Sequence, residues 1–310
     1  ALLLVAAGLW WTKGSHDDDA SGADATTSTP SADATTTTPT GSDGSAADGS
    51  ESTSPATEPE LGSERELVFL RGASGTKSII AHDEPIALAD ADPIKASLSD
   101  DGTMALIVRT DDGARLALGR VDEPDVQVLE VSQGNVQDVD IAPDGSQIAF
   151  TDEAGGDTDI AVLDLSTLEV RTLLASSGDD RDPAWSSDST RVAAVRSRST
   201  GSEIVIIDAA SGAATPVTDG AREVSSPTWS PDDQQIAYLR RDGGSVDIVV
   251  QEVTDPDPKL LALTPDQELD VTWCPGGLVA SYARRGLVEF SPDGSSEDLT
   301  DSPGDANPNC

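Results

Sequence analysis

Few residues in this sequence could carry out catalytic chemistry. The only histidines are His16 and His82, and the only cysteines are Cys274 and Cys310. A Ser-His-Asp triad would need His82, which lies in an apolar run where a histidine is normally structural. The sequence has no G-x-S-x-G pentapeptide, no phosphate-binding glycine loop and no His/Cys cluster with metal-ligand spacing. We therefore expect a protein that is not an enzyme and that uses no cofactor or metal.

A set of mostly acidic residues recurs at intervals of about 44 positions and could bind a ligand. Its members are Lys95, Asp138, Asp182, Ser226 and Asp270, with Asn307 as the expected sixth. If these side chains converge on one concave site, they would receive a basic or amine-bearing peptide. The alternative is that each of them only caps the start of a strand.

Another group of acids recurs at a turn position. Asp144, Asp188 and Asp232 follow a proline or serine and precede Gly, Ser or Asp. Calcium binding and ordinary hairpin-turn chemistry both suit such residues, and their recurrence at one turn position favours the turn.

The elements that must position these residues form a repeat. The clearest copies are DVDIAPDGSQIAF (138–150), DPAWSSDSTRVAAV (182–195), SPTWSPDDQQIAYL (226–239) and DVTWCPGGLVASY (270–282). Around each copy, short apolar or alternating runs indicate four strands per unit. A period in the forties with four strands per unit is typical of β-propeller blades.

The number of units predicts an all-β, six-bladed β-propeller over residues 63–310. Five complete units run over 93–134, 135–178, 179–222, 223–266 and 267–302. Residues 66–90 supply only three strands of a further blade. The segment containing Asn307-Pro308 resembles Asp182-Pro183, which opens an inner strand, so we expect the C-terminal strand to complete the first blade and close the ring.

The repeated motif points to a family. TWSPDDQQIAY and APDGSQIAF resemble the WSPDG-IAF repeat of TolB-like six-bladed propellers, and related repeats occur in the propellers of tricorn protease and the prolyl-oligopeptidase class. The resemblance implies a propeller that binds peptides near its channel. It is a resemblance to the family and not to TolB itself, because the α/β domain that precedes the propeller in TolB has no counterpart here.

The N-terminal residues have a different composition. Residues 1–12 begin with the apolar run ALLLVAAGLWW, which we interpret as part of a membrane segment, with the core of a signal peptide as the alternative. Residues 13–62 contain ten acidic residues and one basic residue and almost no large apolar side chains, so we expect a disordered stalk. This order predicts a propeller outside a cell membrane on a single-pass anchor, the alternative being a secreted or periplasmic protein.

The charge limits the partners. With 57 acidic and 19 basic residues, the net charge is −38, whereas binding to nucleic acid through its phosphates needs a basic face. We expect a protein or peptide partner, with a basic one as the best electrostatic match. The predicted function is a recognition or sensor module, which could be the outer domain of a longer receptor such as a kinase. The alternative is an accessory propeller that handles substrate for a secreted hydrolase or a transport system.

The two cysteines could form a disulfide. Cys274 lies on the predicted inner strand of the last blade, and Cys310 ends the segment predicted to complete the first blade, its neighbour in the ring. A bridge would join the ring at its only non-covalent seam and would need an oxidising compartment. The alternative is two unrelated small residues.

Overall fold

The computed structural model describes the following residues: 67–72, 78–81, 84–86, 88, 92–255, 257–262, 268–291, 295–302 and 305–310. The predicted membrane segment (1–12), the predicted stalk (13–62) and His82 lie outside the described residues, so the expectations about them remain predictions. Among the residues that are described, no helix is long and apolar enough to cross a membrane.

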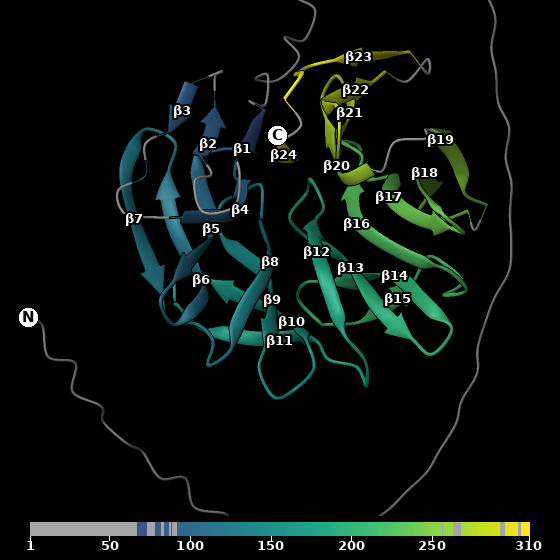
Figure 1. Cartoon of the computed structure of the whole chain (residues 1–310). Coiled ribbons are helices and arrows are strands. Elements are labelled where there is room, and N and C mark those ends of the chain that lie inside the picture. The colour runs from purple at the N-terminus through teal and green to yellow at the C-terminus, as the bar shows by residue number, and fades with distance from the viewer. Residues whose placement is uncertain are drawn as a thin grey trace, which may run out of the picture. The chain divides into compact units, whose positions relative to one another are not determined.

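The described strands form six antiparallel sheets of four strands each, which surround a central axis as the blades of a propeller (Figure 1). Blade 1 contains β24 (Ala306–Asn309), β1 (Val68–Arg71), β2 (Ser78–Ala81) and β3 (Glu84–Ile86). Blade 2 contains β4 (Asp92–Leu98), β5 (Thr103–Thr110), β6 (Gly113–Arg120) and β7 (Glu123–Leu129). Blade 3 contains β8 (Asn135–Ile141), β9 (Gln147–Glu153), β10 (Asp159–Asp164) and β11 (Val170–Leu174).

The remaining three blades repeat this order. Blade 4 contains β12 (Asp180–Trp185), β13 (Arg191–Arg198), β14 (Gly201–Asp208) and β15 (Ala214–Pro216). Blade 5 contains β16 (Glu223–Trp229), β17 (Gln235–Asp242), β18 (Ser245–Glu252) and β19 (Lys259–Ala262). Blade 6 contains β20 (Glu268–Cys274), β21 (Gly277–Tyr282), β22 (Gly286–Phe290) and β23 (Ser296–Asp298). The predicted six-bladed, all-β fold is confirmed.

The C-terminal strand completes the first blade, as the sequence predicts. β24 pairs antiparallel with β1, with Asn309 opposite Val68 and Ala306 opposite Leu70. The fully buried carboxylate of Asp305, just before β24, accepts two hydrogen bonds from the Arg71 guanidinium, at 2.8 and 2.9 Å. Such a paired, two-bond contact is among the stronger polar contacts in proteins and fixes the position of the closing strand.

The hydrophobic core is divided among the blade interfaces. The described residues form six apolar clusters, one between each pair of neighbouring blades, and these clusters contain recurring bulky residues such as Phe150, Trp185 and Tyr238. Among the described residues the cluster between blades 6 and 1 is the smallest, with five buried members, whereas the cluster between blades 3 and 4 has twelve. Since burial of apolar surface is the main source of stability, the described residues of this interface contribute the fewest buried apolar side chains of the six clusters.

The recurring turn aspartates hold the hairpins that follow the inner strands. Asp144 accepts a hydrogen bond from the Ser146 amide at 2.9 Å. Asp188 accepts one from the Ser186 hydroxyl at 2.6 Å, and Asp232 accepts one from the Ser230 hydroxyl at 2.6 Å. These local bonds are the turn chemistry that the recurrence favours. Within the described part of the chain, no group of three or more His, Cys, Asp or Glu residues is arranged to hold a metal ion.

Candidate functional site

The six recurring polar residues converge on one pocket in the central channel. The pocket has a volume of about 370 Å³ and is lined by residues of all six inner strands. We call these six residues the channel ring: Lys95, Asp138, Asp182, Ser226, Asp270 and Asn307. The pocket continues along the inner strands toward the turns that contain Asp100, Pro143 and Pro231. The sequence reasoning therefore selected residues that the fold brings together.

β-Bulges direct these side chains. In every blade the pairing of the inner strand with its neighbour shifts register at or beside the channel-ring residue. A bulge inserts a residue that has no partner opposite and turns its side chain away from the regular alternation. In three blades the ring residue precedes a proline and has a positive φ: Asp182 at 54°, Ser226 at 48° and Asn307 at 52°. Non-glycine residues adopt this conformation at a cost, and Asp and Asn tolerate it best.

Among the described residues, Lys95 is the only basic one that lines the pocket, and the charges of three ring carboxylates act on its ammonium. The Lys95 Nζ donates a hydrogen bond to Asp138 Oδ1 at 2.6 Å. Burial works against the charged ammonium, but the charges of Asp138, Asp270 and Asp182 outweigh it, so the pKa of Lys95 is raised above its ordinary value.

Two neighbouring carboxylates of the ring have opposite pKa shifts. Burial opposes the ionisation of Asp138, but the Lys95 ammonium outweighs it and holds the pKa of Asp138 below its ordinary value. Burial, followed by the negative charge of Asp138, raises the pKa of Asp182 to about 6. The two carboxylates lie close together in a region of low dielectric, but only Asp138 bonds the ammonium. Asp182 therefore takes up a proton at a higher pH than Asp138 does.

Several ring residues also bond to the next blade. Asp182 Oδ2 accepts a hydrogen bond from the Ser226 amide at 3.1 Å, and it forms an ion pair with the Arg181 guanidinium at 2.9 Å. Asn307 accepts one from the Ala96 amide at 2.9 Å and donates one to Asp270 Oδ2 at 3.3 Å. The capping role and the channel-lining role are therefore compatible, because one side chain can bond a strand and still face the channel.

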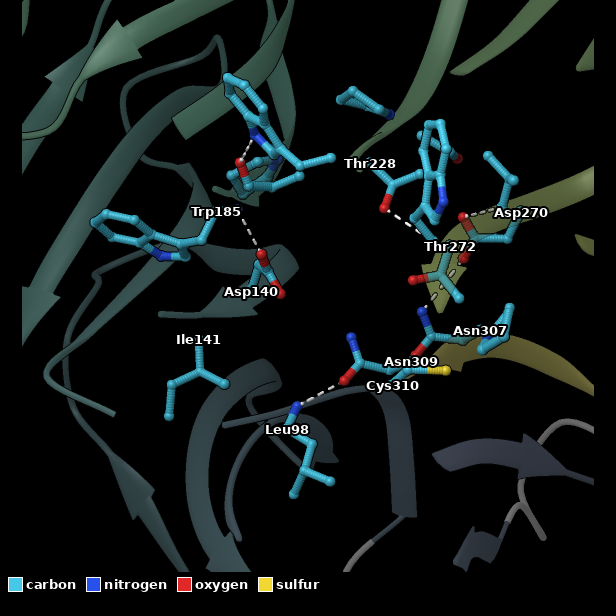
Figure 2. A pocket seen from close by; sticks show the side chains of 18 of the residues that line it. Leu98, Asp140, Ile141, Trp185, Thr228, Asp270, Thr272, Asn307, Asn309 and Cys310 are labelled. Carbon is cyan, nitrogen blue, oxygen red and sulfur yellow. Dashed lines mark hydrogen bonds between the residues drawn. The ribbon is translucent and has the colours of Figure 1, made fainter. Parts of the chain in front are cut away.

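Sequence reasoning missed a second ring, two residues further along each inner strand. Asp140, Thr228, Thr272 and Asn309 are its polar members that line the pocket, Ser97 is at the equivalent position in blade 2 but is buried and does not line the pocket, and blade 4 has Ala184 there. The side chains labelled in Figure 2 surround a common space. Among the described residues, four members of the second ring accept hydrogen bonds from backbone amides of the next blade, and one of them is Ser97, which accepts a bond from the Ile141 amide at 3.1 Å. The Asp140 carboxylate bonds the Trp185 amide at 2.6 Å, Thr228 the Trp273 amide at 3.1 Å, and Asn309 the Leu98 amide at 2.9 Å. Extending the repeat alignment by one strand period of two residues would have found this ring.

The pocket is strongly acidic. Of the residues that the structure describes, five aspartates line it, namely Asp100, Asp138, Asp140, Asp182 and Asp270, against the single basic residue Lys95. Because the pocket is bounded by the low-dielectric walls of the propeller, its negative charges act on a ligand more strongly than charges exposed in water would.

A disulfide lies beside the pocket. Cys274 at the end of β20 is joined to Cys310, with 5.5 Å between the Cα atoms. It links blade 6 to the C-terminal segment of blade 1, across the interface that has the smallest apolar cluster. This pairing is one of the two alternatives that the sequence leaves open.

Comparison with solved structures finds other β-propellers. Solved structures of similar fold include TolB from Acinetobacter baumannii (TM-score 0.66, 19% identity, covering 79% of this chain and 66% of that one). A TolB-like protein from Agrobacterium tumefaciens is also similar (TM-score 0.63, 19% identity, covering 79% and 92%). So is a chain of the nidogen/laminin complex (TM-score 0.61, 10% identity, covering 75% and 92%). At these identities the structural matches show the fold alone.

Sequence comparison is more specific. Among curated protein sequences none matches the chain. A family model, the TolB β-propeller domain (PD40), matches residues 97–297, which is well over half of the chain. The matched region includes four blades' complete inner hairpins and most of the channel-ring residues. This chain therefore belongs to the TolB β-propeller family.

Proposed function

We propose that this protein is a non-enzymatic recognition propeller that binds a peptide or protein partner through a cationic group placed in its central channel. One observation carries the proposal: in the described part of the chain, five carboxylates and a single ammonium line a pocket of about 370 Å³ on the propeller axis. A concave site with a few convergent polar groups is the usual binding site of such a fold.

Charge supports a cationic ligand. The whole chain has a net charge of −38, which attracts a positively charged partner from a distance, and the pocket concentrates the negative field at one place. Long-range attraction of this kind raises the association rate and is weakened by salt. One structural neighbour comes from a protein–protein complex, that of nidogen with laminin, which agrees with a binding role for propellers of this shape.

The proposal includes a location outside the cell membrane, with the propeller tethered through the apolar N-terminal residues as a sensor or recognition domain. The supporting observations are the apolar run at residues 1–11, the acidic, hydrophilic composition of residues 13–62 and the Cys274–Cys310 disulfide. Disulfides persist in oxidising compartments and are rare in the cytosol.

The test of channel binding is a charge-removing double variant. The probe is an acetylated, amidated pentapeptide with one central lysine among glycines, and its glutamate version serves as the negative probe. Asp182→Asn with Asp270→Asn keeps the size of both side chains and removes two charges from the channel ring. We expect calorimetry to show that the variant binds the lysine peptide at least tenfold more weakly than the wild type. Wild-type binding should also weaken below pH 6, where Asp182 takes up a proton.

A matched control separates the site from the overall charge. Asp122→Asn with Asp298→Asn removes two charges from exposed side chains outside the pocket. This control should bind the lysine peptide within about twofold of the wild type, because exposed distant charges are screened. If the channel-ring variant binds as well as the wild type, or if both variants lose affinity equally, the channel is not the binding site.

A further inference from the structure

Lys95 differs from every other member of the channel ring. The other five positions carry carboxylate, amide or hydroxyl oxygens, which accept hydrogen bonds, whereas Lys95 supplies three donors and a positive charge. It is also the only basic residue among the described residues that line the pocket. The ring thus already contains one cation, which comes from its own chain.

We propose that Lys95 is a tethered occupant of an ammonium-binding site, and that the group recognised in the channel is a primary ammonium, a lysine side chain or an N-terminal amine, which takes the place of the Lys95 ammonium. This inference rests on the proposed function and names the chemistry of the ligand at that site.

The contacts of Lys95 show what the site accepts. Its Nζ lies 2.6 Å from Asp138 Oδ1, on the adjacent blade 3. The ammonium is also attracted by Asp270 of blade 6 and Asp182 of blade 4, so carboxylates from three different blades act on one point charge. The Lys95 side chain keeps 29% of its surface accessible, so it can leave this position without repacking the blades.

The geometry favours an ammonium over a guanidinium. An ammonium is a compact point charge, and this one bonds Asp138 of blade 3 while the charges of Asp182 on blade 4 and Asp270 on blade 6 attract it without a direct bond. A guanidinium is a flat fork that binds best to both oxygens of one carboxylate. Asp182 Oδ2 already contacts the Arg181 guanidinium and the Ser226 amide, which leaves this carboxylate less able to accept a second fork.

The tethered lysine also explains how the ring tolerates its own charge. Three carboxylates facing one pocket repel one another, and a buried charge without a partner is costly. Lys95 supplies a partner to the unliganded channel. A tethered group has an effective concentration on the order of millimolar or higher, so the incoming ammonium must compete with it and binds more weakly than the ring alone would allow.

The experiment compares Lys95→Met with the wild type. Methionine has nearly the length of lysine but no charge, so it removes the competitor and leaves the three carboxylates. With the lysine pentapeptide as the probe, calorimetry should show binding at least tenfold tighter to Lys95→Met than to the wild type. The arginine version of the peptide should gain less than the lysine version. Lys259→Met is the matched control, since Lys259 is exposed and outside the pocket, and it should change the affinity less than twofold.

A second variant covers a failure to fold. Lys95→Gln keeps a hydrogen-bond donor for Asp138 and removes the charge, and circular dichroism decides which variant is used. Tighter lysine-peptide binding by either variant supports the inference, even if the wild type itself does not bind, in which case only the function proposed for the wild type fails. Equal binding by variant and wild type overturns the inference and leaves the proposed function standing. Weaker binding by the variant, or no binding by either protein, overturns the inference; no binding by either overturns the proposed function as well.

Discussion

Asp180, the first residue of β12, is a carboxylate that folding leaves only partly satisfied. It is fully buried, and its Oδ1 accepts a hydrogen bond from the Ser176 hydroxyl at 3.0 Å, whereas its Oδ2 has no hydrogen-bond partner among the described residues. Asp305 is equally buried, but both of its oxygens bond Arg71. Burial raises the pKa of Asp180 to about 6, because too few partners compensate for the loss of water.

This shift makes stability depend on pH. The folded pKa of about 6 lies above the unfolded value of about 3.9, so the native state holds the proton more tightly. The wild type should therefore lose stability as the pH rises from 4 to 7, and Asp180→Asn should not show this part of the loss. Between pH 4 and pH 8, we expect this carboxyl group to cost the wild type about 2–3 kcal/mol of unfolding free energy that Asp180→Asn does not lose. Urea unfolding at both pH values measures this difference, and parallel pH profiles for the two proteins would contradict it.

At the scale of elements, the inner strands are joined to each other by side chains as well as by apolar packing. Asp140 on β8 bonds in both directions around the ring: the Ser97 hydroxyl of β4 donates to its Oδ1 at 2.6 Å, and the Trp185 amide of β12 donates to its Oδ2 at 2.6 Å. Blade 4 has Ala184 at the equivalent position, and there the carbonyl oxygen of Ala184 accepts the indole N–H of Trp229 at 3.1 Å. An inner strand can therefore be hydrogen-bonded to the next blade without a carboxylate at this position, but through fewer hydrogen bonds.

Replacing this carboxylate should weaken the inner strands measurably. Asp140→Ala removes two hydrogen bonds to a charged acceptor and leaves the Trp185 amide without its partner, so we expect a loss of about 3–5 kcal/mol in the free energy of unfolding. Thr228→Val is the comparison, because it removes one neutral bond, to the Trp273 amide, and should cost about 1 kcal/mol. Chemical denaturation measures both losses. Equal losses in the two variants would show that the cross-blade bonds of Asp140 contribute nothing beyond an ordinary contact.

At the scale of the whole molecule, the ring closes where the chain is not continuous. Blades 6 and 1 share the smallest apolar cluster among the described residues, and β24 forms only a short ladder with β1. The Arg71–Asp305 ion pair joins β1 to the residue before β24 within blade 1, and the disulfide ties the end of β24 to β20 of blade 6. The ion pair thus supplements the short β24–β1 ladder, and the disulfide supplements the interface between blades 6 and 1.

Removing the disulfide should destabilise the ring. Cys274 and Cys310 are 36 residues apart, and closing a loop of that size contributes about 3–4 kcal/mol in the chain-entropy model. We expect Cys274→Ser with Cys310→Ser to unfold at lower denaturant, and reductant to shift the wild type toward the same midpoint without affecting the variant. Thiol alkylation of the wild type before reduction should label neither cysteine. Labelling of both cysteines would show that the disulfide does not form, and an unchanged midpoint in the variant would show that it does not stabilise the ring.

The order and number of the blades could be predicted from the sequence, because each blade is a local unit. In most blades, four strands that are consecutive in the chain pair with one another. The strands can therefore be predicted from the alternation of apolar residues, and the hairpins from the turn residues around Pro143, Ser187 and Pro231. Even the closure by β24 left a local trace, since Asn307-Pro308 repeats Asp182-Pro183. The channel ring could be selected for the same reason, as one recurring position on each inner strand.

Only the tertiary structure decided how these positions meet. A repeat alignment does not contain the bulges that direct Asp182, Ser226 and Asn307 into the channel with positive φ, because a bulge depends on pairing with the neighbouring strand. It equally contains no distance between Lys95 and Asp138, or between Cys274 and Cys310, since these residues come from different blades. Local pattern determines the blade. Contacts between blades depend on closure of the ring, and those contacts determine which charges face each other in the channel.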